Sequence, residues 1–94
     1  MFFNIIEKEV GIMIFNMRVI DCEGQTLKEF KFEGEDNLMA LLDAEHEVVR
    51  KMDCFKGMEI VGAGMFVSEG TSCRDICFED SNGQEHSYIL EIIK

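Results

Sequence analysis

A single segment of the chain, residues 36–53, has the 3.6-residue periodicity of an amphipathic helix, and this limits what the rest of the chain can form. The positions expected on its inner face recur at helical spacing; they are Leu38, Leu41, Leu42, Glu45, Val48, Val49 and Met52. Acidic residues precede the first turn, and Arg50 and Lys51 lie in the last turn, as the helix dipole favours. One such helix must bury its apolar side against another element, which the remaining sequence has to provide.

The remaining sequence alternates with the two-residue period of β-strands. Strands are predicted at 13–20, 26–32, 58–67, 73–79 and 86–93. Gly24 marks the turn of a first hairpin near 23–24, and Asn82-Gly83 is a strong signal for the turn of a last one. The order predicts an α+β fold: a two-layer domain in ββαβββ order, with the helix packed on one face of a mostly antiparallel sheet.

Two glycines, Gly62 and Gly64, lie inside the predicted strand 58–67. Glycine in a strand indicates a bulge or a place where another backbone approaches closely. Phe66 and Tyr88 are expected on the sheet face away from the helix. There they would form an apolar surface for a partner.

The first residues of the chain carry a possible signature of the gene rather than of the protein. In common codons Lys8-Glu9-Val10 reads AAG-GAG-GTN, a bacterial ribosome-binding site, and Met13 follows at initiation spacing. We therefore expect 1–12 to be a translated leader or N-terminal extension and 13–94 to be a single domain, from a bacterium or its virus. The gene's nucleotide sequence tests this, since AAA-GAA codons would contradict it.

The chain has a net charge of −10, from 19 acidic and 9 basic residues. Such a surface repels phosphate backbones, so direct nucleic-acid binding is not expected, whereas a basic protein partner is attracted; solubility alone is the alternative explanation. No apolar run is long enough to span a membrane. The N-terminus lacks a basic signal-peptide region, which predicts a cytoplasmic protein with reduced cysteines; secretion would instead favour two disulfides.

Catalysis is not expected from this sequence. It contains none of the motifs GxGxxG, P-loop, GxSxG or HExxH, and its two histidines are His46 and His86. His46 lies among charged residues of the predicted helix, where solvent exposure is the simplest explanation. A nucleophile would need a base held by a third group, and no such set is evident.

A structural zinc site is the most specific chemical possibility. The predicted topology brings the end of the helix and the ends of three strands toward one edge of the domain. The four candidate ligands there are Cys22, Cys54, Cys77 and His86. Zinc is held by four such ligands in a tetrahedron and can stabilise a small domain strongly. Cys73 is expected farther away, and the alternative is that the cysteines are ordinary small core residues.

In size, acidity, α+β pattern and possible phage-like gene start, the chain resembles phage-encoded anti-CRISPR proteins. The resemblance implies an inhibitor that occludes a basic nucleic-acid groove, or a moving domain, of a CRISPR effector nuclease without catalysing a reaction. It implies that acids of the helix and of the last hairpin replace phosphates. The candidates are Asp43, Glu47, Glu79, Asp80 and Glu85, each of which could instead belong to a solvated face.

Two other classes remain open at this point. One is an antitoxin or immunity protein that neutralises a basic toxin. The other is a small metal-stabilised structural subunit with no inhibitory role.

Overall fold

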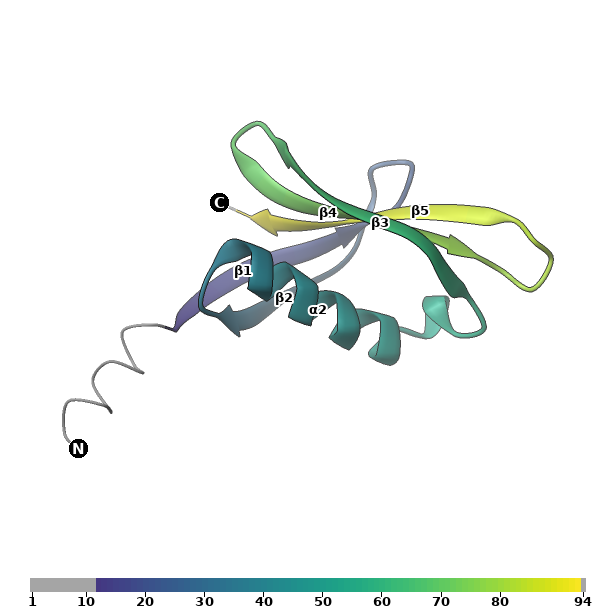
Figure 1. Cartoon of the computed structure of the whole chain (residues 1–94), viewed down its shortest axis with the longest axis horizontal. Helices are drawn as coiled ribbons and strands as arrows, with labels where there is room; N and C mark the ends of the chain where they lie inside the picture. Colours follow the sequence, from purple (N-terminus) through teal and green to yellow (C-terminus); the bar gives the residue numbers. More distant parts are fainter. Residues whose placement is uncertain (1–11, 94) are drawn as a thin grey trace.

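The computed structural model of the chain describes residues 12–93, so all of the expected leader 1–12 except Ile12 lies outside the described residues. Within this range the chain forms five strands, one α-helix and one short 3₁₀ helix (Figure 1). The elements are β1 (Met13–Ile20), β2 (Thr26–Gly34), α2 (Asn37–Lys51), η1 (Asp53–Phe55), β3 (Glu59–Ser68), β4 (Thr71–Glu79) and β5 (Glu85–Ile93). The predicted ββαβββ order is confirmed.

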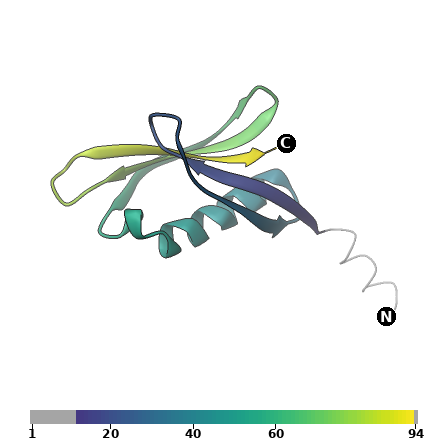
Figure 2. The ribbon, with the colours of Figure 1, turned by 180° about the vertical axis from the view of Figure 1, so that it is seen from behind.

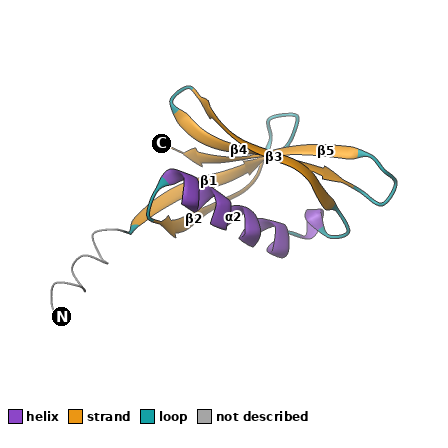
Figure 3. Ribbon diagram, viewed as in Figure 1, coloured by secondary structure: helices purple, strands orange, loops and turns teal. Residues whose placement is uncertain are grey.

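All five strands belong to one antiparallel sheet in the order β2-β1-β5-β4-β3 (Figure 3). The first and last strands are neighbours at its centre, where Asn16–Ile20 pair with Ile89–Ile93. Strands β2 and β3 form the two edges. The sequence patterns placed the strands, whereas this order depends on pairing between distant segments.

The core is formed by buried side chains of α2 and of the strands. The helix contributes Ala40, Leu41, Ala44 and Val48. The strands contribute the other main buried side chains, which are Phe15, Met17, Val19, Ile76, Phe78 and Leu90. The start of the helix lies so close to the end of β2 that a Cβ atom on Gly34 would come within 2.7 Å of the Ala40 Cβ atom.

Leu38 departs from the predicted helix face. Its side chain is 56% exposed, although the periodicity placed it in the core. Asp36 caps the helix by accepting a hydrogen bond from the Met39 N–H at 2.8 Å, so Leu38 lies in the first turn. Its side chain lines an open groove beside β3 rather than the core. Helical spacing defines a face and does not tell how far the sheet extends beneath it.

The segment after α2 contributes a buried aromatic cluster that sequence analysis did not predict. The helix ends at Lys51, and the next residues form η1, which buries Phe55. The Phe55 ring stacks on Phe78 with centroids 4.5 Å apart and meets Tyr88 edge-on at 4.8 Å. Tyr88 therefore packs against the core, and its expected place on the opposite face was wrong.

The turns of the first and last hairpins have the same construction. In each, an aspartate accepts hydrogen bonds on Oδ1 from the N–H groups two and four residues later. A glycine three residues after each aspartate has positive φ: 84° at Gly24 and 82° at Gly83. Asp21-Cys22-Glu23-Gly24-Gln25 and Asp80-Ser81-Asn82-Gly83-Gln84 are the two turns. Each hairpin therefore has a locally encoded turn.

The β3–β4 turn is tighter. Its two residues, Glu69 and Gly70, both have positive φ, at 52° and 76°. This is the geometry that matches the twist of antiparallel strands. Seen from behind, the turn stands clear of α2 (Figure 2). Across residues 12–93, no helix combines the length and apolarity needed to cross a membrane.

Candidate functional site

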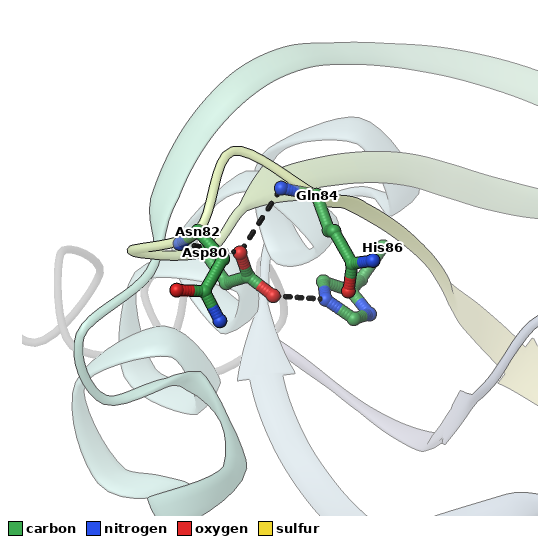
Figure 4. A network of polar contacts seen from close by, with 4 residues as sticks. All are labelled: Asp80, Asn82, Gln84 and His86. Carbon is green, nitrogen blue, oxygen red and sulfur yellow. Dashed lines mark hydrogen bonds and ion pairs between the residues drawn. The ribbon is translucent and has the colours of Figure 1, made fainter.

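The β4–β5 turn holds Asp80 in a polar network (Figure 4). Its Oδ1 atom accepts hydrogen bonds from the N–H groups of Asn82 and Gln84 at 2.9 and 3.0 Å. Its Oδ2 atom lies 2.8 Å from His86 Nε2, which carries the donated proton because the carboxylate can only accept. The bond to His86, followed by those from the backbone, holds the pKa of Asp80 below its ordinary value. Asp80 therefore has both oxygens hydrogen-bonded within its own hairpin.

Glu79 and Glu85 flank this turn and lie directly opposite each other across β4 and β5. The Cys77 Sγ atom lies 3.5 Å from Glu85 Oε1 and donates a weak hydrogen bond to it. Within residues 12–93, no lysine or arginine forms an ion pair with either glutamate. Like charges facing each other across a sheet are destabilising, so this pair gains from an external cation.

The two helix acids predicted to bind a partner have different surroundings. Asp43 is exposed on α2. Glu47 forms ion pairs with Arg50 at 2.6 Å and Lys51 at 2.9 Å. Hydrogen bonding from Lys51 is the main cause that lowers the pKa of Glu47. The structure thus groups Glu79, Asp80 and Glu85 in one hairpin and leaves the helix acids separate.

Two further ion pairs join distant parts of the chain. Arg74 of β4 and Glu45 of α2 approach to 2.5 Å with both side chains largely buried. Arg18 of β1 pairs with Glu91 of β5 at 2.6 Å. Glu45 stood in the apolar series of the predicted helix, which signalled its inward position. Its partner could not be predicted, because Arg74 is 29 residues away.

The predicted zinc ligands are distributed as follows. Cys22 and Cys54 are exposed, Cys77 is half-buried beside Glu85, and His86 binds Asp80. Burial raises the pKa of Tyr88. Nowhere in residues 12–93 do three or more His, Cys, Asp or Glu side chains lie together in an arrangement that could hold a metal.

The thiols also have their own electrostatics. Partial desolvation of the sulfur raises the pKa of Cys54 and of Cys77, although neither residue is fully buried, and the neighbouring Glu85 adds to the effect at Cys77. Cys73 is 1% exposed, and burial likewise raises the pKa of its thiol. Metal binding at these sulfurs would therefore displace a proton at neutral pH.

Strand β3 carries four exposed large apolar residues. Ile60, Val61, Phe66 and Val67 are 43%, 50%, 37% and 71% exposed. Phe66, which was expected on the sheet face away from the helix, is exposed, and it lines a groove of 140 Å³ beside Leu38, Met65 and Val67. Sequence analysis marked the glycines of this strand but not its lack of cover.

A second groove, of 230 Å³, lies between β2 and α2. Apolar side chains that include Phe30, Phe32 and Val48 line it together with three lysines (Lys28, Lys31 and Lys51) and one acid, Glu47, which pairs with Lys51. It is a basic region on an acidic protein. Comparison with known protein families, with curated proteins and with solved structures found no match for this chain.

Proposed function

We propose that this chain is a small acidic binding protein that inhibits a basic, nucleic-acid-handling partner, specifically an anti-CRISPR inhibitor of a CRISPR effector nuclease. The observation that carries the proposal is the facing pair Glu79 and Glu85 beside the Asp80 turn. Two carboxylates without a lysine or arginine partner among residues 12–93 suit an arginine that normally holds phosphate, because a guanidinium can donate to both.

The Asp80 network supports this role by fixing the hairpin. A carboxylate pair on a rigid turn loses less conformational freedom on binding than one on a mobile loop. In the proposal the helix and the sheet form two layers, and Asp43 on α2 adds to the acidic field. Glu47 contributes less than expected, because Arg50 and Lys51 already neutralise it.

The proposed mechanism is occlusion without a chemical step. The net charge of −10 speeds encounter with a basic groove, and the hairpin then excludes the nucleic acid. Because exposed charges are screened by salt, binding should weaken steeply as ionic strength rises.

The test compares two charge reversals of equal size. Plaque formation by a targeted phage is measured in bacteria with active CRISPR immunity that express the chain, and DNA cleavage and binding are measured with the purified nuclease. Glu79→Lys with Glu85→Lys should abolish protection and weaken binding by about 30-fold or more. Glu33→Lys with Glu35→Lys, which changes net charge equally on exposed positions elsewhere, should mainly slow association.

Equal losses in both variants would show that general charge, not the hairpin, mediates binding. Failure to protect phage against every CRISPR type tested would overturn the proposal. Rescue of cells from a co-expressed basic toxin would then assign the chain to the antitoxin class.

Structural zinc on Cys22, Cys54, Cys77 and His86 stays a prediction of the same proposal. Protein purified without added metal should contain nearly one zinc per chain, and a chelator should lower its Tm. Cys54→Ser should remove the response to chelator. Cys73 is unsuitable as the matched control because it is buried, so its serine variant would destabilise the fold by itself. Zinc-free protein with an unchanged Tm in chelator would contradict the prediction.

A further inference from the structure

Strand β3 is an edge strand with little to prevent pairing with another strand. Apart from an irregularity between Ile60 and Gly62 and the charge of Glu59 at its start, it is uncharged and largely exposed among residues 12–93. It pairs with β4 on one side and has no neighbour on the other within the described sheet. Natural edge strands are usually short, charged, bulged or covered. The segment 60–68, here called the β3 edge, contains no charged residue. Met65 is the only residue of this segment that is partly buried.

Nothing in the described part of the chain requires a glycine at position 64. Its φ is not positive, and a Cβ atom there would meet nothing within 4 Å among residues 12–93. Gly62 at least borders an irregularity in the pairing with β4. Glycine weakens a strand and often marks close approach of another group. Such a group would have to come from outside the described residues.

We propose that the β3 edge pairs antiparallel with the β3 edge of a second copy of this chain about a two-fold axis. The small residues Gly62, Ala63 and Gly64 are followed directly by the large residues Met65, Phe66 and Val67. Antiparallel self-pairing reverses this order and sets large residues opposite small ones.

Phe66 shows this complementarity in both central registers. With the axis at Gly64, each Phe66 lies opposite Gly62 of the second copy. With the axis at Met65, it lies opposite Gly64. Cross-strand partners point to the same face of a sheet, so the ring covers the glycine in either case.

Charge favours a second copy over a basic partner as the occupant. The β3 edge has no acid to attract lysine or arginine, and a neutral strand is its own match. The proposed function uses the β4–β5 hairpin instead, so the two interactions are independent. Two molecules of charge −10 repel at long range, and added salt should therefore strengthen self-association while it weakens binding to a basic partner.

Sedimentation velocity over a concentration series tests the proposal. The pairing buries less than a standard interface, so we expect a monomer of 10.8 kDa to shift toward a dimer at about 10–100 µM. Val67→Lys should raise the dissociation constant at least about tenfold, because lysine on an edge opposes pairing. The matched control is Leu27→Lys on β2, an exposed apolar residue on the other edge strand, which should leave the equilibrium unchanged.

A second variant separates folding from pairing. Gly64→Val has room in the monomer and improves strand propensity, so it should raise the Tm. If Gly64 receives Phe66 of a second copy, the same variant should weaken the dimer. A rise in both the Tm and the affinity of the dimer would overturn the role assigned to Gly64.

Two outcomes overturn the proposal as a whole. One is protein that stays monomeric at all concentrations and salt levels; if the amides of β3 then become protected only when a nuclease is added, the edge belongs to that partner. The other is a dimer unaffected by Val67→Lys. Neither outcome bears on inhibition, because inhibition is assigned to the β4–β5 hairpin and not to the β3 edge. The variant Glu79→Lys with Glu85→Lys should accordingly dimerise at least as well as the unchanged chain.

Discussion

Strands β2 and β3 form the two edges of the sheet, and they differ in charge, cover and burial. Strand β2 carries Lys28, Glu29, Lys31 and Glu33, while its Phe30 and Phe32 pack against the core under α2. Strand β3 has no charge over 60–68, and only Met65 joins the core. Alternating charges protect one edge from pairing, whereas the other is left available. Unpaired hydrogen-bonding groups are present on both edges. Whether an edge strand pairs with another chain therefore depends on the features that oppose pairing.

The largest expected effect tests how unequally β3 and β4 support the fold. Phe78→Ala on β4 removes a fully buried ring that stacks on Phe55, and it should cost about 3–5 kcal/mol of unfolding free energy. Val67→Ala on β3 should change stability by less than about 0.5 kcal/mol in monomeric protein. Urea denaturation at low protein concentration measures both. A large loss for Val67→Ala would mean that β3 is covered in the monomer.

The ion pair between Arg74 and Glu45 ties β4 to α2, a connection for which β3 has no counterpart in residues 12–93. Glu45→Ala leaves the guanidinium largely buried and unpaired, so it should destabilise the fold by about 3 kcal/mol. The double variant Glu45→Met with Arg74→Met should recover most of the loss. Equal losses for the single and double variants, measured by denaturation, would show that the charge pairing contributes little.

Removing charges from β2 should reduce the difference between the two edges. Lys31→Thr with Glu33→Thr leaves net charge unchanged and makes the end of β2 resemble β3. Sedimentation should then show stronger self-association that Val67→Lys no longer abolishes. Unchanged association would show that charge alone does not protect β2.

The smallest expected effect is confined to the turn between β4 and β5. Because its pKa is lowered in the fold, Asp80 adds stability that is present above about pH 4, the ordinary value for aspartate, and is lost as pH falls through the lower folded value. Amide chemical shifts of Asn82 and Gln84 should titrate with a midpoint below that ordinary value, and Asp80→Asn should remove the response. A simultaneous change in the amides of β3 would show that the turn and the edge are coupled.

The sequence was informative where structure is local. Alternation and turn residues located the strands, and Asn82-Gly83 correctly marked the last turn. Spacing also explains why Arg50 and Lys51 reach Glu47, although that pairing was not predicted. The faces of Leu38 and Tyr88 were wrong, because each depends on which strand or aromatic ring lies opposite.

The candidate site was predictable in part for the same reason. Glu79, Asp80 and Glu85 lie together because one hairpin carries them all. Asp80 accepts hydrogen bonds from backbone N–H groups and from His86, and these bonds could be found only from the geometry of the turn. The pairing of Arg74 with Glu45 and the lack of cover over β3 are tertiary properties, which no short stretch of sequence contains.

The seam between β1 and β5 also has a consequence for the rate of folding. Each hairpin has its own turn and can form early, but the seam joins segments such as Arg18 and Glu91 that are 73 residues apart. Closing so long a loop loses entropy before its contacts stabilise the chain, which slows folding relative to helical proteins of equal size. Formation of the seam should therefore limit the rate. Truncating Val19 or Leu90 should slow refolding, whereas changes in the β3–β4 hairpin should mainly speed unfolding.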